Sequence, residues 1–151
     1  MHIRPLHAAD LHALLGLYRH LHVADDPLPE PTAIEAIWHE IIASARFRYF
    51  GVFIDDVLVA SCNLTIIPNL TRGCRPHGVI ENVVTHAAHR RKGLGKAVIA
   101  HAVEFARHDG CYKVVLTTSR QDEGTLTFYA STGMDPLGKR AFITRFDQPA
   151  G

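Results

Sequence analysis

Residues 79–99 decide the fold of this chain, and they read Val79-Ile80-Glu81-Asn82-Val83-Val84-Thr85-His86-Ala87-Ala88-His89-Arg90-Arg91-Lys92-Gly93-Leu94-Gly95-Lys96-Ala97-Val98-Ile99. The apolar, β-branched residues at the beginning predict a strand that ends near Thr85, after which the chain turns basic. From Leu94 onward, mainly apolar residues recur at helical spacing: Leu94, Ala97, Val98, His101, Ala102, Phe105 and Ala106. The stretch therefore predicts a strand, a loop that contains glycine, and an amphipathic helix.

The loop between this strand and this helix has the chemistry of an anion site. Backbone N–H groups at a helix N-terminus lack partners in the helix and lie at the positive end of its dipole. Gly93 and Gly95 allow a ligand to approach the backbone closely. The cations that add positive charge here are Arg90, Arg91, Lys92 and Lys96. We call residues 90–96 the phosphate cradle and predict that they bind a diphosphate.

Two nucleotide-binding motifs fit the cradle poorly. A Walker loop requires Ser or Thr directly after its Lys, but Ala97 follows Lys96. A dinucleotide-binding loop requires a third small residue where this chain has Val98. In that motif the first glycine also follows the strand closely, whereas several residues separate the strand from Gly93 in this chain. A P-loop-like nucleotide domain remains a rival interpretation, which predicts binding of ATP or GTP with magnesium.

Composition limits the classes of fold and partner. With 151 residues, 47% of them hydrophobic, the chain suits one globular domain over residues 1–151. The 16 basic and 15 acidic side chains give a net charge of +1, so no nucleic-acid partner is expected. Cys62, Cys74 and Cys111 suit neither a disulfide framework nor a zinc cluster, which predicts a cytoplasmic protein without a metal. No apolar run approaches the roughly 20 residues that span a bilayer, so no membrane association is expected.

Outside the central stretch, strands and helices alternate along the chain. Residue patterns predict helices over roughly 10–23, 32–42 and 125–130, and strands over 1–4, 48–54, 57–66, 112–117 and 139–146. Asp55-Asp56 is expected to form a hairpin turn, Thr32 to cap a helix and Gly110 to end the central helix. A helix joins the central strand to the next one, so these two strands should be parallel. This order predicts a single α/β or α+β domain with a mixed sheet.

Three segments resemble the GNAT superfamily of N-acetyltransferases. Arg90-Arg91-Lys92-Gly93-Leu94-Gly95 behind a strand resembles the acetyl-CoA signature of that family. Phe128-Tyr129-x-x-x-Gly133-Met134 is similar to the family's Phe-Tyr-x-x-x-Gly-Phe ending, and residues 110–116 resemble a strand of its glucosamine-6-phosphate N-acetyltransferases. The match covers roughly residues 48–146. Asp122 departs from it, because many members carry an asparagine there that contacts the cofactor.

The resemblance implies a fold, a cosubstrate and a reaction. The implied fold is a central mixed, mostly antiparallel sheet flanked by about four helices. The cosubstrate is acetyl-CoA, whose pyrophosphate lies on the loop amides and whose pantetheine pairs with the strand backbone. The implied cofactor-binding residues are Val83, Val84, Arg90, Arg91, Lys92, Gly93, Leu94, Gly95 and Lys96. The reaction is direct attack of a primary amine of a small molecule on the acetyl group.

Glu81 and Tyr129 are the candidate catalytic residues. Glu81 lies in an otherwise apolar strand, where burial would raise its pKa toward values useful to a base. Several similar proteins carry a base at this position, although a solvated or ion-paired carboxylate is the alternative. Tyr129 lies where many similar proteins place a proton donor near the cofactor sulfur, and its alternative role is a core aromatic beside Phe128.

The sequence allows more than one interpretation of the acceptor site, the acceptor and the oligomeric state. Asn69, Arg72 and Arg75 lie in a loop before the central strand, and are predicted either to recognise an oxyanion on the acceptor or to be solvated. The acceptor can be an amino acid, an amino sugar, a polyamine or a protein amine. Dimers are frequent in the family, so a homodimer is one expected oligomeric state. The functional alternative is a catalytically silent module that binds CoA as a sensor or interaction domain.

Overall fold

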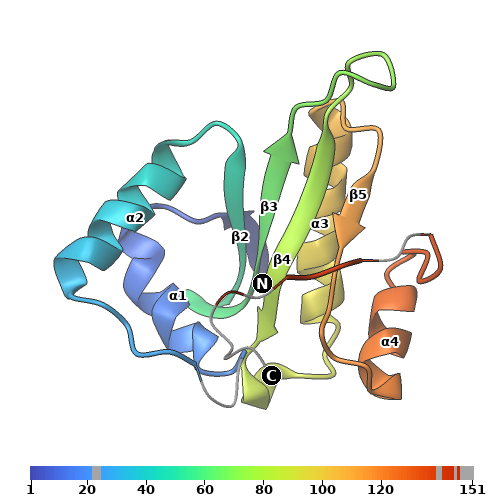
Figure 1. Cartoon of the computed structure of the whole chain (residues 1–151). Helices are drawn as coiled ribbons and strands as arrows, with labels where there is room; N and C mark the ends of the chain where they lie inside the picture. The colour runs from blue at the N-terminus through green and yellow to red at the C-terminus, as the bar shows by residue number, and fades with distance from the viewer. Residues whose placement is uncertain (22–24, 139–140, 145, 147–151) are drawn as a thin grey trace. The chain divides into compact units, whose positions relative to one another are not determined.

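The computed structural model describes residues 1–21, 25–138, 141–144 and 146, and its contacts divide the chain into two compact units, 1–116 and 117–151. The first unit contains the whole sheet. Its strands lie side by side in the order β1 (His2–Pro5), β2 (Phe47–Ile54), β3 (Val57–Ile67), β4 (His77–Thr85) and β5 (Val114–Leu116). The first four are antiparallel, whereas β5 runs parallel to β4 (Figure 1). The prediction of a mixed, mostly antiparallel sheet is confirmed.

Helices cover both faces of this sheet. The helical elements of the first unit are the 3-10 helix η1 (Ala8–Asp10), α1 (Leu11–Tyr18), α2 (Pro31–Ala43), the 3-10 helix η2 (Ala87–His89) and α3 (Leu94–His108). α1 and α2 lie on one face and α3 on the other (Figure 1). Trp38 of α2 contacts Tyr49 of β2 edge to face, with ring centroids 5.3 Å apart. On the opposite face the Cys62 thiol of β3 donates to the Val98 carbonyl of α3 over 3.7 Å. The second unit contains α4 (Glu123–Ala130).

β4 contains a β-bulge. β3 and β4 pair Asn63 with Glu81 and then Ser61 with Val84, so β4 has one more residue than β3 between these pairs. Asn82, directly after Glu81, has a φ of 51°, in the left-handed region that asparagine tolerates better than most residues. We call Asn82 and the residue after it the β4 bulge.

The β4 bulge changes the face on which the strand buries its apolar side chains. Gly78 faces α3, because a Cβ at this position would lie 3.5 Å from the Cβ of Ala106. Ile80, two residues further on, shares that face. Val84 would share it too in a regular strand, but instead packs in the apolar cluster that contains Trp38, on the α1 and α2 side. One strand therefore contributes to both halves of the core.

Several predicted boundaries are confirmed and others are wrong. Asp55 and Asp56 both have positive φ angles of 48° and 62°, as a tight hairpin turn requires. α2 begins at Pro31 with Glu30 as its cap, so Thr32 is not the cap. α2 buries fully only Trp38, and its Ile37 is 55% exposed.

The first predicted helix and the last predicted strand also differ from the structure. The first helix was predicted to run to residue 23, but α1 ends at Tyr18, and residues 22–23 lie outside the described residues. Of the strand predicted at 139–146, residues 139, 140 and 145 lie outside the described residues, and 141–144 form no strand. Phe142 and Ile143 are exposed there. Among the described residues, the model has no helix with the length and apolar character to cross a membrane.

Candidate active site

The phosphate cradle leads from the end of β4 into the N-terminus of α3. Gly93 precedes the helix with a φ of 77°, and no side chain caps the helix there. A Cβ on Gly93 would meet nothing within 4 Å, so its surroundings are open. Leu94 and Gly95 are buried, which anchors the first turn of α3 against the sheet. The uncapped N–H groups remain available to an anion, and the predicted strand, loop and helix are confirmed.

The cations of the cradle do not all have the same role. Arg90 donates from Nη2 to the His20 carbonyl over 2.9 Å and from Nε to the Thr85 carbonyl over 3.3 Å. It therefore ties the turn after α1 to the end of β4. Arg91, Lys92 and Lys96 are exposed, which leaves their charges free to act on a ligand of the cradle.

Three histidines gather beside the cradle. The rings of His20 and His86 are 4.1 Å apart between centroids, and those of His86 and His89 are 5.7 Å apart. Loss of water around the imidazole lowers the pKa of His20, and the neighbouring His86 and Arg90 add to this effect. Within the described part of the chain, no group of three or more His, Cys, Asp or Glu side chains is arranged to hold a metal ion.

Glu81 lies in the middle of β4, directly before the β4 bulge, and its side chain is exposed. The prediction that burial would act on this carboxylate is therefore wrong. In the strand register Glu81 pairs with Asn63, on the face of the sheet that carries α1 and α2. Val84 beyond the bulge is only 3% exposed, while Val83 is half-buried.

The buried Asn63 side chain contacts the backbone of Glu81, and the sequence did not predict this contact. The Asn63 side chain is 7% exposed in all. Its Oδ1 accepts from the Glu81 backbone N–H over 3.1 Å, and its Nδ2 donates to the Tyr49 hydroxyl over 3.2 Å. Next to it, burial and the neighbouring Tyr49 raise the pKa of the Tyr18 hydroxyl above its ordinary range. The available signal was the polar pair Ser61 and Asn63 in the otherwise apolar run 57–67.

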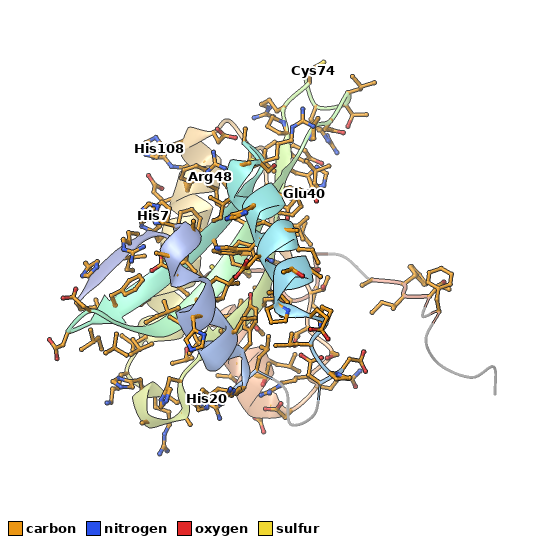
Figure 2. The ribbon with its side chains drawn as sticks, turned by 90° about the vertical axis from the view of Figure 1, so that its left-hand side faces the viewer. His7, His20, Glu40, Arg48, Cys74 and His108 are labelled. Carbon is orange, nitrogen blue, oxygen red and sulfur yellow. The ribbon has the colours of Figure 1, made fainter. Side chains whose placement is uncertain are left out.

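The predicted substrate loop lies at the other end of β4 from the cradle. Figure 2 labels Cys74 at the tip of this loop and His20 near the opposite end of the first unit. Asn69 braces the loop, since its Nδ2 donates to the Thr71 carbonyl over 2.8 Å and to the Arg75 carbonyl over 3.3 Å. Arg75 in turn donates to the Arg72 carbonyl over 3.1 Å. The structure does not bring these residues together with the cradle, because the nine residues of β4 lie between the loop and the cradle, and residues 77–80 of that strand lie between the loop and Glu81.

In the second unit, α4 carries Tyr129 and begins at a capping carboxylate. Asp122 accepts from the Thr125 backbone N–H over 2.9 Å and from its hydroxyl over 2.8 Å. These hydrogen bonds, the backbone one first, lower the pKa of Asp122. Tyr129 is half-buried, with its ring centroid 5.0 Å from that of Phe128. Asp122 thus has a structural role as the cap of α4.

Comparisons with known proteins show which proteins this chain resembles. A glucosamine 6-phosphate N-acetyltransferase 1 from Oryza sativa subsp. japonica is 36% identical over 135 residues, which cover 87% of this chain and 79% of that protein. The glucosamine 6-phosphate N-acetyltransferase of Trypanosoma brucei brucei is 46% identical over 76 residues, which span half of this chain and half the length of that relative. A solved structure from Agrobacterium tumefaciens str. C58 has a TM-score of 0.90 and 38% identity, with 97% of this chain and 100% of the other covered.

The resemblance predicted from the sequence is confirmed at the level of the family and its acetyltransferase class. The model of the acetyltransferase (GNAT) family matches residues 11–134, which include all of α1 to α4 and the strands β2 to β5. The chain therefore belongs to the acetyltransferase (GNAT) family.

Proposed function

We propose that this protein transfers the acetyl group of acetyl-CoA to the primary amine of a small molecule, and that the acceptor is an amino sugar phosphate of the glucosamine 6-phosphate type. Membership of the acetyltransferase (GNAT) family supports the reaction. The relatives named glucosamine 6-phosphate N-acetyltransferase support the acceptor class. We place the reaction in the cytoplasm, within a single domain formed by the chain, and leave the oligomeric state to measurement.

One observation carries the proposal: the N-terminus of α3 follows a left-handed glycine and has no side-chain cap. In this arrangement the N–H groups after Gly93 can donate to the pyrophosphate of CoA. Arg91, Lys92 and Lys96 add charge attraction from exposed positions. The backbone of Val83 and Val84 would pair with the pantetheine arm, which directs the thioester toward the middle of β4.

The chemistry assigns one role to each candidate catalytic residue. Glu81 removes a proton from the acceptor ammonium, directly or through water, so that the nitrogen lone pair can attack the acetyl carbonyl. The carbon–sulfur bond then breaks and the electron pair leaves with the sulfur. Tyr129 donates a proton to that thiolate, which releases CoA as a thiol. The nitrogen loses its second proton as the amide forms, and this proton restores the Tyr129 hydroxyl through solvent. No metal takes part in this scheme.

A thiol-release assay over a panel of amines tests the proposal. The panel contains glucosamine 6-phosphate, glucosamine, lysine and spermidine, with binding of CoA measured in parallel by calorimetry. We expect release with glucosamine 6-phosphate above all others. Binding of CoA without release for any amine would instead favour the catalytically silent CoA-binding module. The matched control is the double variant Gly93→Asp and Gly95→Asp, which should lose CoA binding because two carboxylates would repel the pyrophosphate.

A further inference from the structure

We propose that Asn63 is a positioning residue of the acetyltransferase site, because its side chain fixes the place of the β4 bulge and thereby the direction of Glu81. This inference rests on the proposed function, in which Glu81 is the base. Asn63 does not act on the substrate in this proposal. It acts through the strand that carries the base.

The side of the sheet on which Glu81 lies depends on where the extra residue of β4 is accommodated. With the bulge directly after Glu81, its side chain shares the face of Asn63. If the bulge moved one or two residues toward the start of β4, Glu81 would follow the later phase of the strand and face α3. A bulge is tolerated at several places in a strand of apolar residues, so some contact must select this one.

The Asn63 amide makes that selection. Its Oδ1 accepts the Glu81 N–H over 3.1 Å, so it holds the last residue before the bulge. Its Nδ2 donates to the Tyr49 hydroxyl over 3.2 Å, and the Tyr49 ring contacts Trp38 of α2 edge to face. The oxygen therefore cannot swing away without breaking a second buried hydrogen bond. Because Asn63 is almost fully buried, water cannot easily replace either partner.

Amide hydrogen exchange tests this contact without relying on turnover. In Asn63→Leu, which keeps the branched shape and removes both polar atoms, we expect the Glu81 amide to exchange at least about tenfold faster, while the Ile80 amide changes little. Asn63→Asp keeps an oxygen acceptor and should restore protection of the Glu81 amide. Ser61→Ala is the matched control, since the Ser61 hydroxyl lies buried on the same strand without a hydrogen-bond partner among the described residues. Unchanged exchange in Asn63→Leu would overturn the proposal.

Kinetics then show whether the contact serves the reaction. We expect Asn63→Leu to lower kcat about tenfold, to leave the KM for acetyl-CoA unchanged, and to have almost no further effect in a Glu81→Gln background. Equal losses in both backgrounds would show a merely structural role and overturn the proposal. Tyr49→Phe, which keeps the ring and removes the hydroxyl, provides a milder variant if Asn63→Leu does not fold, and should shift both readouts in the same direction. A wild-type protein that releases no thiol would refute the proposed function, whereas the exchange result concerns Asn63 alone.

Discussion

At the scale of single residues, two glycines without close neighbours should respond in opposite ways to alanine. Gly93 has a φ of 77°, where an L-residue is strained, while Gly16 lies exposed within α1. We expect Gly93→Ala to lower the free energy of unfolding by about 1 kcal/mol. Gly16→Ala should raise it by about 0.5–1 kcal/mol, because alanine loses less backbone entropy in a helix. Urea denaturation of both variants measures this difference, and a gain of stability in both would argue against the left-handed conformation of Gly93.

The hydroxyl of Tyr129 gives a second test at this scale. If Tyr129 protonates the leaving thiolate, Tyr129→Phe should lower kcat by about a hundredfold, since general acid catalysis contributes at least this much. CoA affinity should stay close to that of the wild type, because the ring and its contact with Phe128 remain. Steady-state kinetics combined with calorimetry decide the matter. A variant with full kcat would leave Tyr129 as a packing residue.

At the scale of structural elements, neighbouring arginines of the cradle should separate folding from binding. Arg90→Met removes hydrogen bonds to the His20 and Thr85 carbonyls, so it should lower stability by about 1 kcal/mol and also disturb the cradle. Arg91→Met should leave stability unchanged and weaken CoA binding about two- to fivefold, an effect that salt would reduce. Equal behaviour of the two variants would show that Arg90 does not tie the turn after α1 to β4.

The cap of α4 predicts an acid-sensitive helix. The folded-state pKa of Asp122 lies below its ordinary value of 3.8, so its carboxylate stabilises the folded helix above that pH. This contribution is lost as the pH falls through the lower folded value. We expect α4 to fray below about pH 3.8, as followed by the Cα chemical shifts of residues 123–130. Asp122→Asn still caps a helix but cannot titrate, so its α4 shifts should not change over this range.

Sequence patterns predicted the elements better than their internal irregularities. The strands 48–54 and 57–66 lie within one residue of β2 and β3, because alternating apolar residues and the turn at Asp55-Asp56 define them locally. The β4 bulge was not predictable, since it depends on the contact between Asn63 and the Glu81 backbone N–H, which lie 18 positions apart in the sequence. The same holds for Arg90, which was assigned to the phosphate on charge alone although its guanidinium also binds two carbonyls.

At the scale of the whole molecule, ligand-induced stabilisation distinguishes the nucleotide rival from the proposed cosubstrate. A ligand at about one hundred times its dissociation constant stabilises the folded state by about 2.7 kcal/mol. For a chain of this length, that corresponds to a rise in melting temperature on the order of 5 to 10 °C. We expect this rise with acetyl-CoA and none with ATP and magnesium, measured by differential scanning fluorimetry. The reverse result would favour the P-loop-like domain.

The order of elements was sufficient to predict the fold class, but it did not predict the structure at the ends of the chain. The helix between β4 and β5 required a parallel pair, and the structure has one, with Gly78 opposite Val114. The segment 141–144 has the apolar residues of a strand, yet these are exposed, because alternation alone does not supply a neighbouring strand. For the same reason, local patterns could not show that the Asn63 side chain would contact the Glu81 backbone.

The change of face within β4 also affects how the first unit melts. Ile80 and Val84 are part of one short strand but belong to opposite layers of apolar packing. Loss of β4 from the sheet would remove apolar contacts from both layers at once. We therefore expect both layers to unfold at a common temperature, which gives a single calorimetric peak for residues 1–116.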